Sequence, residues 1–145
     1  MGTGTKVVLD TNVLISALGW SGPERYVYEL CLHGEIQLCI SSSVLEELLR
    51  VLDYPKFRFP SEHKVMFIQG LLSLANFVEP RTVPDVVKED PTDNHVLACA
   101  AAGEATFLIT GDNHLLSLKS YGSTVICSAA TFLRSHYRSP GHPVS

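Results

Sequence analysis

Hydrophobic residues along the chain follow two spacings, and each spacing predicts one kind of element. Short continuous apolar runs between polar residues are typical of strands that are buried on both faces. Such runs occupy residues 6–10, 36–40, 77–78, 106–110 and 124–128. Between them, apolar residues recur every three or four positions, which predicts amphipathic helices. These helices are expected at about 12–18, 23–33, 42–53, 61–75, 91–102, 112–118 and 128–137.

The alternation of strands and helices predicts the fold class. It is typical of an α/β protein with three layers, α/β/α, in which helices cover both faces of a central parallel sheet. A length of 145 residues suits a single domain. We expect its core at about 6–134 and a loose C-terminal tail at 135–145. In open sheets of this kind, ligands bind beyond the carboxyl ends of the strands.

Composition and charge say more about where the protein is expected to work than about its chemistry. A net charge of -4 gives no overall basic character that would indicate nucleic-acid binding, although local patches matter more than totals. No apolar run approaches the roughly 20 residues of a membrane span, and MGTGTK lacks the apolar core of a secretory signal. The four cysteines form no CxxC pair, so we expect buried thiols in a reducing cytoplasm rather than a zinc site.

Acidic residues stand where the predicted strands end. Asp10 directly follows the apolar run of the first strand, and Asp112 comes two residues after the strand at 106–110. An unpaired carboxylate at the end of a buried strand is costly. Each of these aspartates therefore either caps the helix that follows it or faces something positive.

The helix at 91–102 begins with two further aspartates. Asp90 precedes Pro91 and is expected to be the N-cap of this helix. Asp93 lies in the first turn, where an acid favours the helix dipole. Its spacing also places it at the N-terminal end of the inward stripe, which consists of Val96, Leu97, Ala100 and Ala101. A capping acid alone would not need that face, so Asp93 is the functional candidate.

The helix at 42–53 offers a fourth acid, and two adjacent glutamates compete for this place. Its predicted inward stripe consists of Leu45, Leu48, Leu49 and Leu52, extended on one side by Val44 and Val51. At about 100° per residue, Glu47 falls roughly 40° beyond the valine edge and Glu46 roughly 60° beyond the opposite edge. Glu47 is the better placed of the two by a modest margin, and Glu46 stays open.

Four carboxylates at one sheet edge predict a metal site. They would repel one another unless they were protonated or bound a cation. Oxygen ligands favour Mg²⁺ or Mn²⁺ over zinc. Hard cations at carboxylate clusters serve phosphoryl chemistry, in which they neutralise phosphate oxygens and activate water. We therefore expect the metal-binding and catalytic groups to be Asp10, Glu47, Asp93 and Asp112.

At these residues the sequence resembles the PIN-domain family of nucleases. The matching segments include VVLDTNVLISAL, SSSVLEELLRVLDYPKF and DPTDNHVLACAAAGEATFLITGDNHLL, and the resemblance runs from about 6 to 133. Within the family, the chain looks most like the toxins of toxin–antitoxin pairs, the VapC-like group. The resemblance implies a metal-dependent ribonuclease selective for single-stranded RNA. It also implies that Asn12 and Thr110 orient the acids, and it gives His114 no firm role.

Residues that would contact RNA are sparse in this acidic chain. The stretch YPKFRF interleaves basic and aromatic side chains, which could supply base stacking. A second candidate group follows the first helix, close in sequence to Asp10. The candidates are Lys56, Arg58, Arg25 and Trp20. Each group also has a structural reading, because the aromatic rings of YPKFRF could pack on the core and the first helix could carry Trp20 away from the acids.

Several other functions fit part of the pattern. The expected partners are single-stranded RNA, an antitoxin protein and a second copy of the chain, with no membrane. The alternatives are an RNA-processing enzyme, a non-catalytic binding module of the same fold and another carboxylate-metal phosphotransfer enzyme. A dehalogenase-type phosphatase would need an aspartate two residues after Asp10, where Asn12 stands. The segment DTNVL also lacks the glycine-rich turn of a dinucleotide-binding fold.

Overall fold

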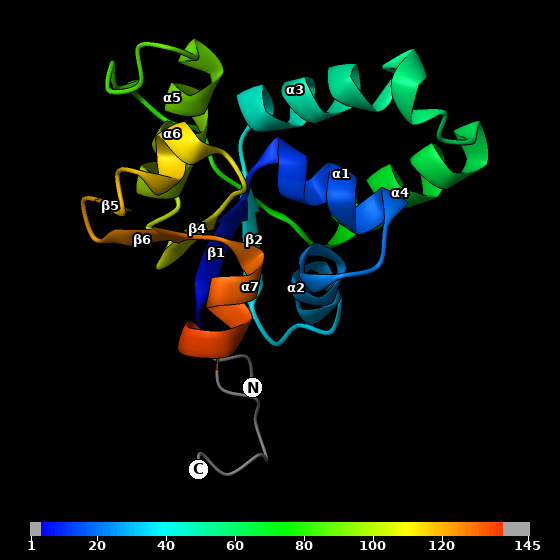
Figure 1. Cartoon of the computed structure of the whole chain (residues 1–145), viewed down its shortest axis with the longest axis horizontal. Coiled ribbons are helices and arrows are strands. Elements are labelled where there is room, and N and C mark those ends of the chain that lie inside the picture. The colour runs from blue at the N-terminus through cyan, green and yellow to red at the C-terminus, as the bar shows by residue number, and fades with distance from the viewer. Residues whose placement is uncertain (1–3, 138–145) are drawn as a thin grey trace, which may run out of the picture.

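The structure is a computed structural model, and it describes residues 4–137. Within these residues the chain forms a six-stranded sheet in the order β3-β2-β1-β4-β6-β5 (Figure 1). The strands are β1 (Lys6–Leu9), β2 (Gln37–Ile40), β3 (Asn76–Phe77), β4 (Phe107–Ile109), β5 (Ser120–Tyr121) and β6 (Thr124–Cys127). The first five of these in sheet order, β3 to β6, are parallel, and β5 pairs with β6 in the antiparallel sense. The predicted α/β/α class is confirmed.

Helices cover both faces of the sheet (Figure 1). They are α1 (Thr11–Gly19), α2 (Pro23–Leu32), α3 (Ser42–Leu52), α4 (Ser61–Leu74), α5 (Pro91–Ala102), α6 (Asn113–Leu116) and α7 (Ala129–Thr131), with a 3₁₀ turn at Pro55–Phe57 and a π-helical turn at Phe132–His136. Helix α5 packs on β1, β2 and β4, while α2 contacts α1 and α7. The middle of α5 is therefore buried, from Val96 to Ala100.

Strand β1 lies between β2 and β4, so its carboxyl end lies in the middle of one edge of the sheet. Val8 of β1 is in register with Cys39 of β2 on one side and with Leu108 of β4 on the other. The backbone N–H of Asp10 donates to the carbonyl oxygen of Ile109 at 3.0 Å, so β1 and β4 end side by side. The residues that follow these two strands are thereby brought to one edge of the sheet.

The structure differs from the predicted pattern at short elements. Neither the 3₁₀ turn at Pro55–Phe57 nor strand β5 was expected. Strand β5 exists because a tight turn folds it onto β6, and that turn needs the left-handed backbone of Gly122, with φ of 58°. Two residues assigned to inward stripes are exposed instead, Leu49 of α3 and Ala101 of α5. Each lies at the margin of its stripe, where packing rather than periodicity decides burial.

Three further predictions concern the cysteines, membrane spans and the C-terminal tail. Within the described residues, the four cysteines are free and buried. Over the same residues, no helix combines the length and the apolar character that crossing a membrane requires. The predicted loose tail begins at 135, where the structure still shows the hydroxyl of Tyr137 donating to the carboxylate of Glu35. The remainder of that tail, residues 138–145, lies outside the described residues.

Candidate metal centre

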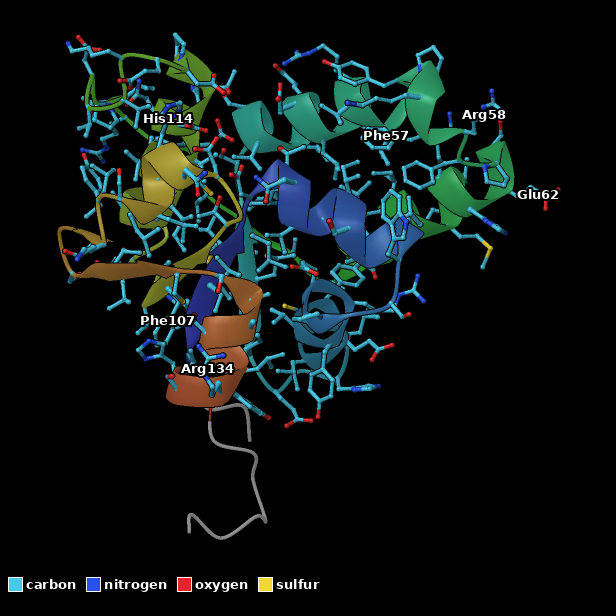
Figure 2. The ribbon with its side chains drawn as sticks, in the orientation of Figure 1. Phe57, Arg58, Glu62, Phe107, His114 and Arg134 are labelled. Carbon is cyan, nitrogen blue, oxygen red and sulfur yellow. The ribbon has the colours of Figure 1, made fainter. Side chains whose placement is uncertain are left out.

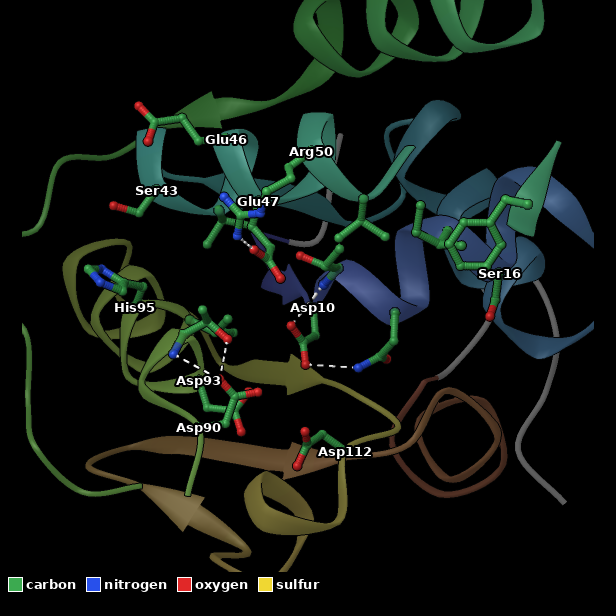
Figure 3. Close-up of a pocket in the computed structure, with 18 of the residues that line it drawn as sticks. Asp10, Ser16, Ser43, Glu46, Glu47, Arg50, Asp90, Asp93, His95 and Asp112 are labelled. Atoms are coloured by element: carbon green, nitrogen blue, oxygen red, sulfur yellow. Dashed lines mark hydrogen bonds and ion pairs between the residues drawn. The ribbon is translucent and has the colours of Figure 1, made fainter. Parts of the chain in front are cut away.

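A cavity of about 710 Å³ opens beside the carboxyl ends of β1 and β4. Its lining includes all four predicted acids, and Figure 3 shows Asp10, Asp93 and Asp112 coming from three separate elements to one end of it. Helix α1 forms one wall and helix α3 another. Trp20, the residue after α1, and Phe57, beyond the end of α3, also line the cavity. The cavity therefore has an acidic end and an aromatic end.

Asp10 is held rigidly by its neighbours. Its side chain accepts hydrogen bonds from the backbone N–H of Thr11 at 2.8 Å, the amide of Asn12 at 3.0 Å and the hydroxyl of Thr110 at 2.8 Å. Burial nevertheless raises the pKa of Asp10, and the charge of Asp112 adds to that rise, while the three hydrogen bonds oppose it. A carboxylate in this position is fixed in orientation but short of positive charge.

Asn12 and Thr110 each connect two parts of the site. The hydroxyl of Thr110 donates to Asp10 and accepts the backbone N–H of Asp112 at 3.0 Å. The amide of Asn12 donates to Asp10 through its nitrogen and accepts the N–H of Gly111 through its oxygen at 3.0 Å. These contacts tie the loop after β4 to the start of α1, so the distance between Asp10 and Asp112 is set by side chains from both segments.

Asp93 is the most perturbed acid of the cluster. It is only 4% exposed, at the start of α5, as the helix phase predicts. Burial, followed by the charges of Asp112, Asp10 and Asp90, raises its pKa to about 7. Within residues 4–137, its Oδ2 atom and the hydroxyl of Thr11 are the buried side-chain polar atoms that have no hydrogen-bond partner. Both of these residues line the cavity.

Asp112 begins α6 and brings a histidine to the site. Its Oδ1 atom accepts the backbone N–H groups of His114 at 2.7 Å and Leu115 at 3.3 Å, so it is an N-cap as well as a cavity residue. The Nδ1 atom of His114 lies 3.7 Å from the same oxygen. Ligand atoms of Asp93, Asp112 and His114 all fall within 4.8 Å of one another. No sequence pattern assigned His114 a role, because only the fold brings His114 close to Asp93 at the start of α5.

The structure separates the two glutamates of α3. Val44, Leu48 and Leu52 are the buried residues of this helix, which shifts its inner face toward the valine side. The side chain of Glu47 is 26% exposed and pairs with Arg50, one turn later. Figure 3 shows the carboxylate of Glu47 pointing toward Asp10, whereas that of Glu46 points away. Both residues line the cavity, but Glu47 faces the other acids.

Two of the remaining candidates stabilise the scaffold, although Asp90 also lines the cavity. Asp90 accepts the N–H and the hydroxyl of Thr92, at 3.1 and 2.6 Å, as the expected N-cap of α5. The guanidinium of Arg25 donates to the carbonyl oxygens of Ala17 and Leu18, both at 2.9 Å, at the C-terminal end of α1. Arg25 therefore lies outside the lining of the acidic cavity.

The other predicted RNA contacts lie near the aromatic end. Trp20 lines the cavity and is 55% exposed. Lys56 and Arg58 are exposed beside it without lining it. Figure 2 shows Phe57 and Arg58 at one side of the molecule and His114 at the other.

Asn94 is a positioning residue that sequence reasoning missed. It is buried next to Asp93, and its oxygen accepts the backbone N–H groups of Val86 and Val87 at 3.0 and 2.9 Å. Its nitrogen donates to the carbonyl oxygen of Val87 at 2.8 Å. These bonds fix the loop before α5 against the helix, and with it the position of Asp93. The available signal was the polar pair Asp93 and Asn94 just before the apolar run that begins at Val96.

The donor set fits a hard divalent cation. Asp10, Glu47, Asp93 and Asp112 line one cavity, and one buried carboxylate oxygen of Asp93 has no partner. Among the described residues, the group whose ligand atoms lie within 4.8 Å of one another contains Asp93, Asp112 and His114, but not Asp10 or Glu47. Such an orphaned oxygen costs stability unless a donor or cation meets it. Mg²⁺ and Mn²⁺ bind through one or two carboxylates together with water and substrate phosphate, so the cluster needs no further protein ligands. His114 could add a nitrogen ligand, which Mn²⁺ accepts more readily than Mg²⁺.

Comparisons with known proteins agree with this geometry. A family model described as PIN domain matches residues 6–114, a range that contains all four acids. The uncharacterised protein MJ1680 of Methanocaldococcus jannaschii is 32% identical over 118 residues, which cover 79% of this chain and 75% of that protein.

Two solved structures share the fold. VapBC2 from Rickettsia felis, bound to a DNA fragment from its promoter, superposes with a TM-score of 0.59 at 17% identity, over 84% of this chain and 97% of that one. PAE2754 from Pyrobaculum aerophilum gives a TM-score of 0.58 at 14% identity, over 92% and 90% of the two chains.

Proposed function

This chain belongs to the PIN domain family, and from that premise we propose that it is a metal-dependent endoribonuclease that hydrolyses phosphodiester bonds of single-stranded RNA. Its catalytic and metal-binding groups are Asp10, Glu47, Asp93 and Asp112. The observation that carries the proposal is the buried, unpartnered carboxylate oxygen of Asp93, in a pocket that Asp10 and Asp112 make still more negative.

The four acids have different roles in the proposed reaction. Asp10 and Asp112, held apart at a fixed distance by Thr110 and Asn12, provide rigid oxygen ligands. Asp93 supplies the carboxylate whose ionisation at neutral pH requires nearby positive charge. A bound Mg²⁺ or Mn²⁺ neutralises phosphate oxygens and lowers the pKa of a water molecule. Glu47, on the opposite wall and paired with Arg50, would accept a hydrogen bond from the attacking water.

Cleavage of a mixed RNA pool tests this proposal. With Mn²⁺ or Mg²⁺ the protein should cleave unpaired regions, and EDTA should abolish the cleavage. Asp93→Asn should lose activity while it remains folded, because it retains the shape of the side chain. Asp85→Asn is the matched control, since Asp85 is an exposed acid that pairs with Lys88 away from the cavity. Full activity of Asp93→Asn, or of the wild type in EDTA, would contradict the proposal.

The biological setting is a second part of the proposal. The fold shared with VapBC2 supports an antitoxin partner that silences the nuclease, and the four buried free thiols support a reducing cytoplasm. A small open reading frame beside the gene, whose product co-purifies with the chain and inhibits its cleavage of RNA, is the expected finding. An active protein with no such inhibitor would instead be an RNA-processing enzyme.

A further inference from the structure

The aromatic end of the cavity takes no part in the chemistry described above. Four aromatic side chains form a cluster there, Trp20, Tyr54, Phe57 and Phe59. The rings of Phe57 and Phe59 stack with centroids 5.4 Å apart and planes 10° from parallel. Trp20 meets both rings edge-on, at centroid distances of 6.4 and 6.2 Å. Trp20 and Phe57 belong to the cavity lining, so the cluster is a wall of the same cavity that contains the acids.

The backbone holds this aromatic wall in place before any ligand binds. Gly19 lies so close to Phe59 that an added Cβ atom would stand 2.9 Å from the ring, so a side chain here would push the ring out of its place. The 3₁₀ turn at Pro55–Phe57 is followed by Arg58 in the left-handed conformation, with φ of 53°. These constraints position the rings without help from a ligand, which reduces the entropy lost on binding.

The wall leaves aromatic surface open to solvent at the cavity. Trp20 is 55% exposed and Tyr54 is 41% exposed. Tyr26 and Phe77 are exposed to a similar extent, but unlike Trp20 they do not line the cavity. Positive charge accompanies this surface. The ammonium of Lys56 lies 5.2 Å from the centroid of the Phe57 ring, and Arg50 lines the cavity between the aromatic wall and the acids. Aromatic faces beside cations match a nucleobase and its phosphate.

The two ends of the cavity are a fixed distance apart. Asp10 caps the start of α1 and Trp20 follows its end, and the nine residues of the helix span roughly 13 Å at 1.5 Å per residue. When the scissile phosphodiester of an RNA strand lies at the acids, the base that reaches the aromatic wall must therefore belong to a neighbouring nucleotide. In a duplex the bases are stacked and paired, and they cannot reach a protein ring without being flipped out.

We infer that Trp20 and Phe57 form a subsite that stacks an unpaired nucleobase of the RNA strand whose backbone lies at the acidic end. The inference rests on the proposed nuclease function and explains how the site would select single strands. Selection arises because only an unpaired base can insert against the wall, while Arg50 and Lys56 contact its phosphates.

Tryptophan fluorescence gives a direct test, because Trp20 is the only tryptophan of the sequence. The wild-type protein is titrated in EDTA with a short single-stranded oligoribonucleotide and with an abasic strand that has the same number of phosphates. Stacking should quench the fluorescence with the base-containing strand and leave it nearly unchanged with the abasic strand. Equal responses to the two strands would overturn the inference, since both would then bind through charge alone.

Substitutions give a second readout that does not depend on fluorescence. Trp20→Leu should weaken the binding of labelled single-stranded RNA by about 5- to 100-fold, the range expected when one stacked base is lost. Binding of the abasic strand should not change. Tyr26→Leu is the matched control, because Tyr26 is equally exposed but lies outside the cavity lining. Equal affinities of the wild type and Trp20→Leu for single-stranded RNA would overturn the subsite.

The results also separate this inference from the proposed function. The protein could show base-dependent quenching of Trp20 fluorescence and yet cleave no RNA. That result would support the stacking subsite and contradict the proposed nuclease activity. Metal-dependent cleavage by a protein whose fluorescence does not distinguish the two strands would preserve the nuclease and overturn the subsite.

Discussion

At the scale of single residues, the site buries an acid close to other acids, and no positive group within residues 4–137 neutralises it. Asp93 is buried beside two other acids, and its pKa of about 7 means that the folded protein favours its protonated form. The unfolded chain would ionise the same group near pH 4. Without a cation, the folded protein therefore binds a proton more tightly than the unfolded chain does, and stability should fall between these two pH values as the pH rises.

Replacing this carboxyl group should stabilise the protein in the absence of metal. In EDTA, Asp93→Asn should raise the free energy of unfolding at pH 8 by about 2–4 kcal/mol, because about three pKa units of unfavourable ionisation are removed. At pH 3 the gain should vanish, since the carboxyl group is then largely protonated in both the folded and the unfolded state. Urea denaturation at the two pH values measures the difference. A variant less stable than the wild type at pH 8 would mean that Asp93 is already satisfied by a partner within the protein.

The choice between Glu46 and Glu47 can also be tested at this scale. Glu47→Gln should reduce the rate of RNA cleavage under saturating Mn²⁺ by about 10³-fold, the loss expected when several kcal/mol of transition-state stabilisation disappear. Glu46→Gln should retain most of the activity, because its carboxylate points away from the other acids. The melting temperatures should differ little, as both acids lie near the start of one helix. A larger loss of activity for Glu46→Gln would reverse the assignment.

At the scale of elements, helix α1 connects the chemistry to the scaffold. It starts at Asp10 and ends where the guanidinium of Arg25 bonds the carbonyl oxygens of Ala17 and Leu18. These bonds satisfy acceptors that a helix C-terminus leaves without partners, and they join α1 to α2. Arg25 is thus a structural residue in this fold, although its position in the sequence also suggested contact with RNA.

Arg25→Leu should reveal that structural role. Loss of its two charge-assisted hydrogen bonds should lower the free energy of unfolding by about 1–3 kcal/mol. The rate of RNA cleavage per folded molecule should stay within error of the wild type below the melting transition. Arg58→Leu, an exposed arginine next to the aromatic wall, is the comparison and should leave stability nearly unchanged. A specific loss of RNA affinity in Arg25→Leu would restore its assignment as an RNA contact.

The same scale shows how far the sequence alone could go. Strands β1, β2, β4 and β6 were predictable because they are continuous apolar runs, and the acids after them followed from the rule that parallel strands end at one edge. Strand β5 and the turn at Pro55–Phe57 were not, since they are too short for periodicity to register. His114 and Asn94 were missed for another reason: their roles depend on contacts with segments that only the fold brings near.

At the scale of the whole molecule, folding and metal binding should be coupled. The acids come from β1, α3, α5 and the loop after β4, so a cation bound there would join segments that are far apart in sequence. Because the unfolded chain lacks this arrangement, binding should stabilise the folded state.

Mn²⁺ should therefore raise the melting temperature. At a concentration of about 100 times the dissociation constant, the stabilisation is about 2.7 kcal/mol, which corresponds to about 5–10 °C for a domain of this size. The shift should be larger at pH 8 than at pH 5, since protons compete for Asp93. Thermal denaturation monitored by circular dichroism measures it. An equal shift in Asp93→Asn would place the cation elsewhere.

The central claim is that this acidic edge hydrolyses RNA with an activated water rather than with the 2′-hydroxyl of the RNA. The most direct measurement is the chemical nature of the ends of the RNA fragments produced by the wild-type protein in Mn²⁺. Attack by water assisted by a metal should give 5′-phosphate and 3′-hydroxyl ends, and EDTA should give no fragments. Fragments that carry 2′,3′-cyclic phosphates, and that also form in EDTA, would contradict the account.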